Sequence, residues 1–382
     1  MYVMGFRGDW KALVAIFNLV RNYNTNKAPY FQLIMWDNVD GFNNIYFIIY
    51  NISSHGFASL YWPLKVCWLC HATKGMENDV HMSITNVSDT ALWWQTLCQS
   101  DPWQIQPNYT RLIGFKISMI VPDLLHCWNL GILRHMLGSS LRIILAERFV
   151  FDAPTVPERF AMATESLMAF ARQHRYPLRF KKLTQRKVGW KANRYPELAC
   201  SGYDSFVVAS WLEKLLEPIN MYKEIKTLLW SGNRAVGLMY SAGRFLTPVE
   251  KQSLKMYGDI FLQTYVQEAG KAISAHKLLF RVTPKLHLLS HLFVSARIAN
   301  PSFYSTWMDE DFLKKIGKTL GLTPYRTAQK RLLQRWLLAI PAHLNKNLGW
   351  FLVRNGCNAP TRCVQWTGAL HGKTVLGSQR KF

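Results

Sequence analysis

The sequence predicts an α-rich α/β protein, and three observations support this fold class. From Val121 onward, apolar residues recur at helical spacing through most of the chain. Before that residue, short apolar runs alternate with turn residues, as expected for strands. Hydrophobic residues make up 49% of the 382 residues. That share supplies a large core, which excludes a wholly disordered chain, and the length suggests about two or three structural units.

The net charge favours a polyanionic partner. The chain has 46 lysines and arginines against 23 aspartates and glutamates, a formal charge of +23, which suits nucleic acid or an acidic membrane face. The sequence lacks the run of about 18 apolar residues that a membrane span needs, and charged residues stand where a secretory signal would be apolar. The seven cysteines are odd in number and sparse, so we expect an intracellular protein without a disulfide framework.

The first residues predict a strand, a turn and a helix. Residues 2–6 have the composition of a strand, Arg7-Gly8-Asp9 that of a turn, and residues 13–20 carry an apolar helical face. A strand needs a neighbour to pair with, and no strand precedes this one. We therefore expect a truncated chain.

Residues 28–65 differ in composition from the rest of the chain. Asp37 and Asp40 are the only charged residues from Ala28 to Pro63, where aromatic residues, isoleucine and asparagine dominate. One interpretation is a buried hairpin with Asp40-Gly41 as its turn. The other is a foreign block such as a translated intron, because AT-rich codons favour this composition. Composition alone leaves both interpretations open.

Apolar spacing marks the first helices of the body. Pro122 suits the first turn of a helix whose apolar face would carry Leu124, Trp128 and Ile132. A second helix is expected over residues 157–172.

Capping residues mark the later helices. Thr247-Pro248-Val249-Glu250 form a capping box, and the helix that it opens could continue to Leu279, since Pro284 forbids further extension. Thr323-Pro324 begins another helix. Residues 345–382 lose this periodicity and are expected to form a loose tail.

Four short motifs follow one another along the chain. They are the Gly8-Asp9 turn, the pair Cys67 and Cys70, the pair Asp123 and His126, and the acidic run Asp309-Glu310-Asp311 after Pro284-Lys285-Leu286-His287. Each motif is weak alone, because a lone CxxC is often incidental and a helix-start aspartate often caps its helix. The sequence contains no P-loop, GxGxxG, GxSxG or fixed-period repeat.

In this order the motifs resemble the catalytic half of a DDE transposase of the CACTA and Plavaka-like group. Residues 6–10 are similar to the turn that carries the family's second catalytic aspartate, and residues 66–71 to the CxxC that follows it. Residues 122–132, with their DxxH, are the most specific match, and residues 283–291 resemble the segment before the third acid. The resemblance implies an incomplete RNase H-like core with a large helical insertion.

The resemblance implies two-metal DNA strand cleavage and transfer. Two Mg²⁺ ions about 3.5–4 Å apart would be held by carboxylates, with Asp9 as the second acid. The family's glutamate favours Glu310 as the third acid, whereas the spacing from Trp307 also allows Asp311. The first acid would stand upstream of Asp9, before this sequence begins. We therefore expect an inactive fragment or relic.

The cysteines and histidines of these segments also suggest a structural zinc site. Cys67 and Cys70 would supply two thiolates, which are soft ligands suited to Zn²⁺, and His126 a third ligand. The candidates for the fourth ligand are Asp123, His71 and Cys127, and the sequence does not choose among them.

Two further histidines, His287 and His291, stand four residues apart. On a helix this spacing places both side chains on one face. We expect them to pack or to form hydrogen bonds rather than to bind a metal ion.

The densest basic run predicts contact with DNA phosphates. Its candidate DNA-binding residues are Arg175, Arg179, Lys181, Lys182, Arg186, Lys187, Lys191 and Arg194. Aromatic residues such as Tyr176, Phe180 and Trp190 lie among them, a mixture that suits nucleic acid. The alternative is a solvated charged face.

These features divide the chain into six segments. They are a core remnant at 1–27, the atypical insert at 28–65, a CxxC-bearing segment at 66–120, a helical insertion with the basic run at 121–282, the third-acid segment with helices at 283–344, and the tail at 345–382. The family has only a short linker before its CxxC, which favours the foreign-block interpretation of 28–65.

The leading hypothesis is a transposase-derived protein that binds DNA in the nucleus, with homo-oligomerisation left open. The alternative is a non-catalytic basic nucleic-acid-binding protein with a structural zinc site. A protein that binds membrane surfaces through its charge and its tryptophans is a third class.

Overall fold

The computed structural model describes residues 66–74, 80–99, 115–294 and 299–307, residue 334 and four strand segments before residue 50. The chain divides into two compact units, and the first comprises Met1–Val3 and Leu13–Ser305. All elements named below belong to that first unit.

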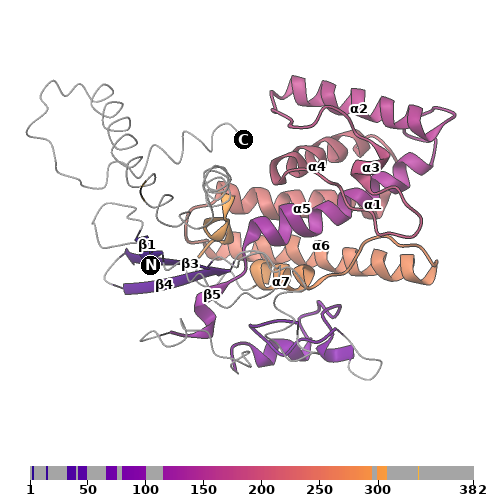
Figure 1. Ribbon diagram of the computed structural model, residues 1–382. Coiled ribbons are helices and arrows are strands. Elements are labelled where there is room, and N and C mark those ends of the chain that lie inside the picture. Colours follow the sequence, from indigo (N-terminus) through magenta and orange to yellow (C-terminus); the bar gives the residue numbers. More distant parts are fainter. Residues whose placement is uncertain are drawn as a thin grey trace, which may run out of the picture. The chain divides into compact units, whose positions relative to one another are not determined.

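The described part of the chain is mostly helical (Figure 1). A π-helix, η5 (Leu125–Ile132), leads directly into α1. The α-helices are α1 (Leu133–Ala146), α2 (Val156–Gln173), α3 (Gln185–Val188), α4 (Gly202–Leu216), α5 (Lys223–Ser241), α6 (Pro248–Ser274) and α7 (Pro284–Val294). Short 3₁₀ helices are η1 (Val80–Met82), η2 (Leu92–Thr96), η4 (Ile117–Met119) and η6 (Pro301–Tyr304). Among these residues no helix has the length and apolar character of a membrane span.

The strands correct one prediction at the start of the chain. β2 (Val14–Ala15) pairs antiparallel with β1 (Tyr2–Val3), so the helix predicted over residues 13–20 does not run through this segment. A short apolar run fits a strand or a helix, and here pairing with β1 decides. No RNase H-like core is visible in the part of the chain that the structure describes.

A second sheet contains a hairpin. β3 (Gln32–Val39) and β4 (Phe42–Ile49) are antiparallel, with Val39 opposite Phe42, and β5 (Ile120–Val121) pairs parallel to β4. This register leaves two residues, 40–41, for the connection, the loop length of a tight hairpin. The pairing agrees with the hairpin interpretation of residues 28–65. The foreign origin of the block stays a prediction.

Capping boxes set where the main helices begin. At the start of α6, the Thr247 side chain accepts from the Glu250 N–H at 3.3 Å and the Glu250 carboxylate accepts from the Thr247 N–H at 2.7 Å. The predicted capping box is therefore confirmed. The helix ends earlier than predicted, because His276 turns left-handed (φ +54°) and the Lys277 N–H donates to the Ala272 carbonyl.

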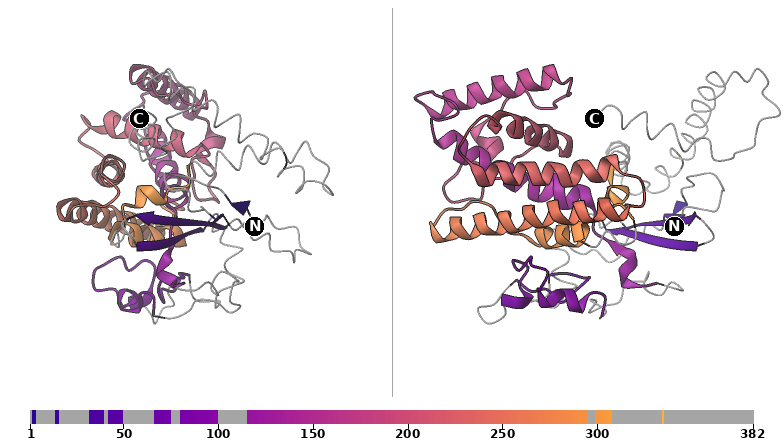
Figure 2. Two further views of the ribbon diagram at one scale, coloured as in Figure 1. Left: turned by 90° about the vertical axis from the view of Figure 1, so that its left-hand side faces the viewer. Right: turned by 180° about the vertical axis from the view of Figure 1, so that it is seen from behind.

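The core lies where η5, α5, α6 and α7 meet. Figure 2 shows α5 and α6 side by side, with α7 against α6. Trp128 of η5 is 1% exposed, and its ring meets those of Phe261 in α6 and Phe293 in α7 at centroid distances of 4.9 and 6.3 Å. A side chain at Gly232 of α5 would lie 2.5 Å from the Trp128 ring. This packing fixes the position of α7.

Gly258 is expected to be required for the close approach of α6 to α7. A Cβ there would lie 2.6 Å from that of Phe293, whereas nothing lies within 4 Å of Gly270 in the same helix. We expect Gly258→Ala to lower the free energy of unfolding by about 1 kcal/mol or more, because the steric cost exceeds the gain in helix propensity. Gly270→Ala should raise it by up to about 1 kcal/mol. Urea denaturation of both variants checks this, and equal stabilisation would contradict the observed packing.

Candidate metal centre

The two cysteines lie in a buried turn. Cys67 and Cys70 are 1% and 3% exposed. The Leu69 N–H donates to the Cys67 sulfur at 3.3 Å, and the Val66 N–H closes the turn onto the Ala72 carbonyl at 3.1 Å. The Cys98 N–H donates to the Leu69 carbonyl at 2.7 Å. These bonds order the backbone of the turn, and the N–H directed at the Cys67 sulfur favours its thiolate.

Helix α7 presents two histidines to this turn. His287 and His291 are separated by one helical turn, and both are buried. The Trp93 ring packs edge-on against both imidazoles, at centroid distances of 4.5 and 5.2 Å, and Trp94 packs against His291 at 5.5 Å. The indoles therefore restrict both imidazole rings.

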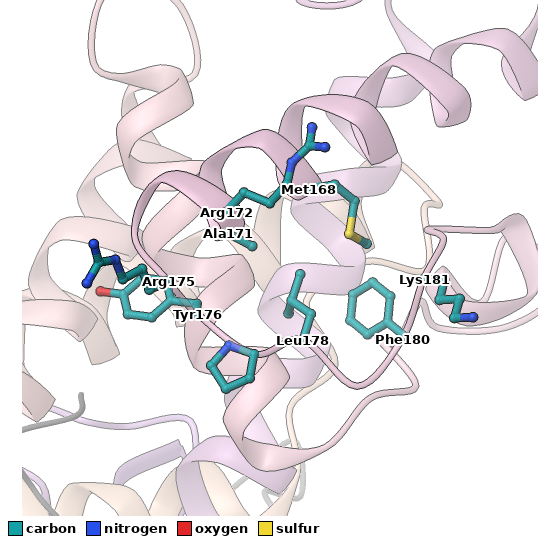
Figure 3. Close-up of a pocket in the computed structure, with 9 residues that line it drawn as sticks. Met168, Ala171, Arg172, Arg175, Tyr176, Leu178, Phe180 and Lys181 are labelled. Carbon is teal, nitrogen blue, oxygen red and sulfur yellow. The ribbon is translucent and has the colours of Figure 1, made fainter.

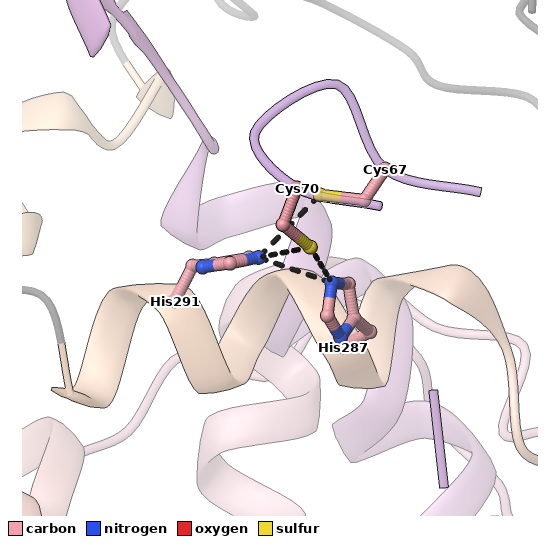
Figure 4. Close-up of side chains that lie close together, drawn as sticks. All are labelled: Cys67, Cys70, His287 and His291. Atoms are coloured by element: carbon pink, nitrogen blue, oxygen red, sulfur yellow. Dashed lines mark hydrogen bonds between the residues drawn. The ribbon is translucent and has the colours of Figure 1, made fainter. Parts of the chain in front are cut away.

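The four side chains converge on one point (Figure 4). Cys70 Sγ lies 3.2 Å from His287 Nε2 and 3.6 Å from His291 Nε2, and Cys67 Sγ lies 3.4 Å from His291 Nε2. The two Nε2 atoms are 3.0 Å apart. All four ligand atoms lie within 4.8 Å of one another.

This cluster could hold a metal ion such as zinc. In a tetrahedral site with Zn–S bonds of about 2.3 Å and Zn–N bonds of about 2.0–2.1 Å, ligand atoms are separated by roughly 3.3–3.8 Å. The four separations given above, 3.0–3.6 Å, are close to these, and the other two are at most 4.8 Å. Two thiolates and two imidazoles select zinc among common ions, whereas Mg²⁺ requires oxygen ligands. A ligand set of four protein atoms leaves no open position, as in structural sites.

The pKa shifts of Cys70 and His291 suit metal binding. The hydrogen bond with Cys67, together with those from His287 and His291, lowers the pKa of the Cys70 thiol to about 2. Burial raises the pKa of the Cys67 thiol, so zinc binding would displace the proton of Cys67. Burial also lowers the pKa of His291, which keeps its imidazole neutral. A neutral imidazole and a thiolate are the forms that coordinate zinc.

The cluster differs at two positions from the ligand set that the sequence predicts. Asp123 and His126 do not join the cluster; instead, the Asp123 carboxylate is hydrogen-bonded to the His126 imidazole. The same carboxylate accepts from the Leu125 N–H at 3.0 Å and the His126 N–H at 3.3 Å. Asp123 therefore caps the start of the helix. It also orients His126, because residues three positions apart lie on the same face of a helix.

The other candidates for the fourth ligand also lie outside the cluster. The His71 N–H donates to the Thr96 hydroxyl, and Cys127 is buried in the core, where burial raises the pKa of its thiol. The ligands that the sequence analysis missed are His287 and His291, which it assigned to packing. Their spacing on one helix face is typical of metal ligands and could have identified them.

The predicted catalytic acids, Asp9, Glu310 and Asp311, lie outside the described residues. Asp309 does as well. No Mg²⁺ site has support in the part of the chain that is described.

The predicted DNA-binding residues follow α2 and extend past α3. Most are exposed, and Lys187 is half-buried with its Nζ 5.0 Å from the centroid of the Phe180 ring. From Arg172 to Tyr195 the sequence contains no acidic residue. The interleaved aromatic residues pack inward: Phe180 is buried, and Trp190 meets Phe160 at 5.3 Å. The cations of this surface therefore face solvent while most of its aromatic rings support the fold.

Comparisons with protein-family models, with curated proteins and with solved structures found no match to this chain.

Proposed function

We propose that this chain is a transposase-derived DNA-binding protein with one structural zinc ion. The observation that carries the proposal is the meeting of two motif segments, 66–71 and 283–291, in one buried site. Both segments belong to the resemblance with DDE transposases, and they are more than two hundred residues apart. A shared site gives a physical reason for both motifs to occur in one chain.

The zinc ion would connect the CxxC turn to the helical body. Residues 66–99 contain only short 3₁₀ helices among their described residues. Such a segment gains little from secondary structure, and four metal bonds can supply folding free energy directly. The proposed role of the ion is therefore structural rather than catalytic.

The basic surface would bind DNA through its phosphates. It consists of the exposed cations between Arg172 and Arg194 with no acid among them. Lysine and arginine side chains that displace counterions from DNA give binding that weakens steeply with salt. The expected interaction is strong at low salt and independent of sequence, because phosphates carry no sequence information.

Neutralising four cations of this surface should weaken DNA binding. In the variant Arg179, Lys182, Arg186 and Lys191 are each replaced by glutamine; all four are exposed. We expect affinity for a short duplex at low salt to fall by about tenfold to a hundredfold. The slope of log K against log salt should become shallower by about 2–4. Fluorescence anisotropy over a salt series measures both quantities.

A matched control removes the same charge elsewhere. Lys223, Arg234, Lys251 and Lys277, which are exposed on or beside α5 and α6, are replaced by glutamine. This variant should keep the salt slope of the original protein within about 1. An equal loss in both variants would refute the assignment of DNA binding to this surface.

The catalytic role of Asp9 and an acid within 309–311 is part of the transposase proposal and not of the DNA-binding test. The test requires a chain that carries all three acids: Mg²⁺-dependent nicking that disappears there on Asp9→Ala would support this role, because removing one metal-holding carboxylate leaves the two ions unpositioned.

A further inference from the structure

A pocket of about 490 Å³ lies at the end of α2, within the basic surface (Figure 3). Its apolar part is formed by Met168, Leu178 and Phe180. Arg172, Arg175 and Lys181 also line it, and their charged ends extend outward around the apolar side chains (Figure 3). The volume falls within the range of roughly 300–1,000 Å³ that ligand sites occupy.

The charges around the pocket are unbalanced. No acidic residue lines it. In the described part of the chain, none of Arg172, Arg175 and Lys181 forms an ion pair. All three are exposed, so an anion can reach them from solvent. An apolar centre surrounded by free cations matches a ligand with a flat apolar part and negative groups on either side.

An unpaired nucleotide has that chemistry. Its base is a flat ring that is stabilised by apolar and aromatic contacts, and its neighbouring phosphates are anionic. In duplex DNA the bases are stacked inside, so a duplex would use the cations and leave the apolar centre empty. We propose that this pocket receives one unpaired base of a DNA single strand, with the flanking phosphates at Arg172, Arg175 and Lys181. The inference rests on the proposed DNA-binding function and adds a preference for single-stranded DNA.

Arg175 occupies a backbone position that glycine would fill at lower cost. Its φ is +57°, and the Tyr176 N–H that follows donates to the Ala171 carbonyl at 2.8 Å, which closes the end of α2. Such left-handed positions after a helix favour glycine. His276 ends α6 in the same way, with a φ of +54°, and does not line the pocket. The pair provides a matched test of the Arg175 side chain.

The first experiment removes apolar surface from the pocket without changing its charge. Leu178→Asn replaces an apolar side chain of the lining with a polar one of similar size, and Met162→Asn makes the same kind of change at an exposed position of α2 outside it. The probe is a short DNA strand with one 2-aminopurine, used single-stranded and as a duplex with the full-length protein. We expect Leu178→Asn to weaken single-strand binding about fivefold or more and to reduce 2-aminopurine quenching. Duplex affinity should stay within about twofold, as should all values for Met162→Asn.

The second experiment separates binding from folding. Arg175→Gly and His276→Gly should each raise the melting temperature by about 1–3 °C, because each relieves a left-handed residue. Only Arg175→Gly should weaken single-strand binding, by about threefold or more. A protein that gains stability and loses affinity cannot owe the loss to misfolding.

The outcomes distinguish this inference from the function on which it rests. If Leu178→Asn lowers single-strand and duplex affinity equally, or lowers neither, the pocket does not hold a base and the inference is overturned. Retained duplex binding with the normal salt dependence would leave the proposed function intact. Failure of the unaltered protein to bind DNA in either form would overturn both.

Discussion

Replacing Cys70 with serine should remove the zinc ion and much of the stability of the protein. The Cys70 Sγ atom lies 3.2 Å from His287 Nε2 and 3.6 Å from His291 Nε2, and Cys70 is 3% exposed. A serine hydroxyl is a poor zinc ligand, and structural zinc in small domains contributes apparent binding free energies of about 10–16 kcal/mol. We expect zinc content to fall from one ion per chain to near zero. The melting temperature should fall by about 10 °C or more.

Cys98→Ser is the matched control for this substitution. Cys98 is an exposed free thiol whose N–H is bonded to the CxxC turn, and it is not part of the cluster. Its substitution should leave zinc content unchanged and the melting temperature within about 2 °C. Elemental analysis and thermal denaturation of the purified variants measure both. Loss of zinc from the Cys98 variant, or its retention in the Cys70 variant, would contradict the assignment of ligands.

Trp128→Ala should cause the largest loss of stability in the helical core. Trp128 is almost fully buried and joins η5 to α6 and α7 through its contacts with Phe261 and Phe293. Removing such a ring leaves a cavity that close-packed neighbours cannot fill. We expect the free energy of unfolding to fall by about 3–5 kcal/mol, with an unchanged denaturant slope.

Trp230→Ala serves as the comparison in the core experiment. Trp230 is 38% exposed on α5, with its ring against Tyr257 at 5.4 Å. Removing the Trp230 ring loses less buried apolar surface than removing the Trp128 ring, and water can enter the space that it leaves. We therefore expect the free energy of unfolding to fall by about 1 kcal/mol or less. Equal losses for the two tryptophans in urea denaturation would show that the core is not centred on Trp128.

Local sequence predicted the features that depend on local interactions. The capping box at Thr247 and Glu250 is visible in four residues, and it begins α6 as expected. The helix expected over residues 157–172 corresponds to α2, Val156–Gln173, by the same kind of argument. The helix predicted around Val14 was wrong, because a short apolar run fits both the helical and the strand periodicity. Pairing with a partner strand decides between the two conformations.

Local sequence predicted two of the four residues of the metal centre. The CxxC spacing identified Cys67 and Cys70, but the choice of partners depends on which helix packs against the turn. His126 stands closer in sequence than His287 and His291, yet Asp123 already engages its imidazole. The helix that carries His287 and His291 reaches the turn through core packing around Phe293. The residues near the cysteines do not indicate which helix packs against the turn.

Zinc K-edge X-ray absorption of the purified protein tests the central claim most directly. A site of Cys67, Cys70, His287 and His291 predicts two sulfur neighbours at about 2.3 Å and two nitrogen neighbours at about 2.0–2.1 Å. Any zinc that His287→Ala retains should keep both sulfur neighbours and show an altered shell of light neighbours. Protein without zinc after growth in zinc-containing medium, or a first shell with fewer than two sulfurs, would contradict the account.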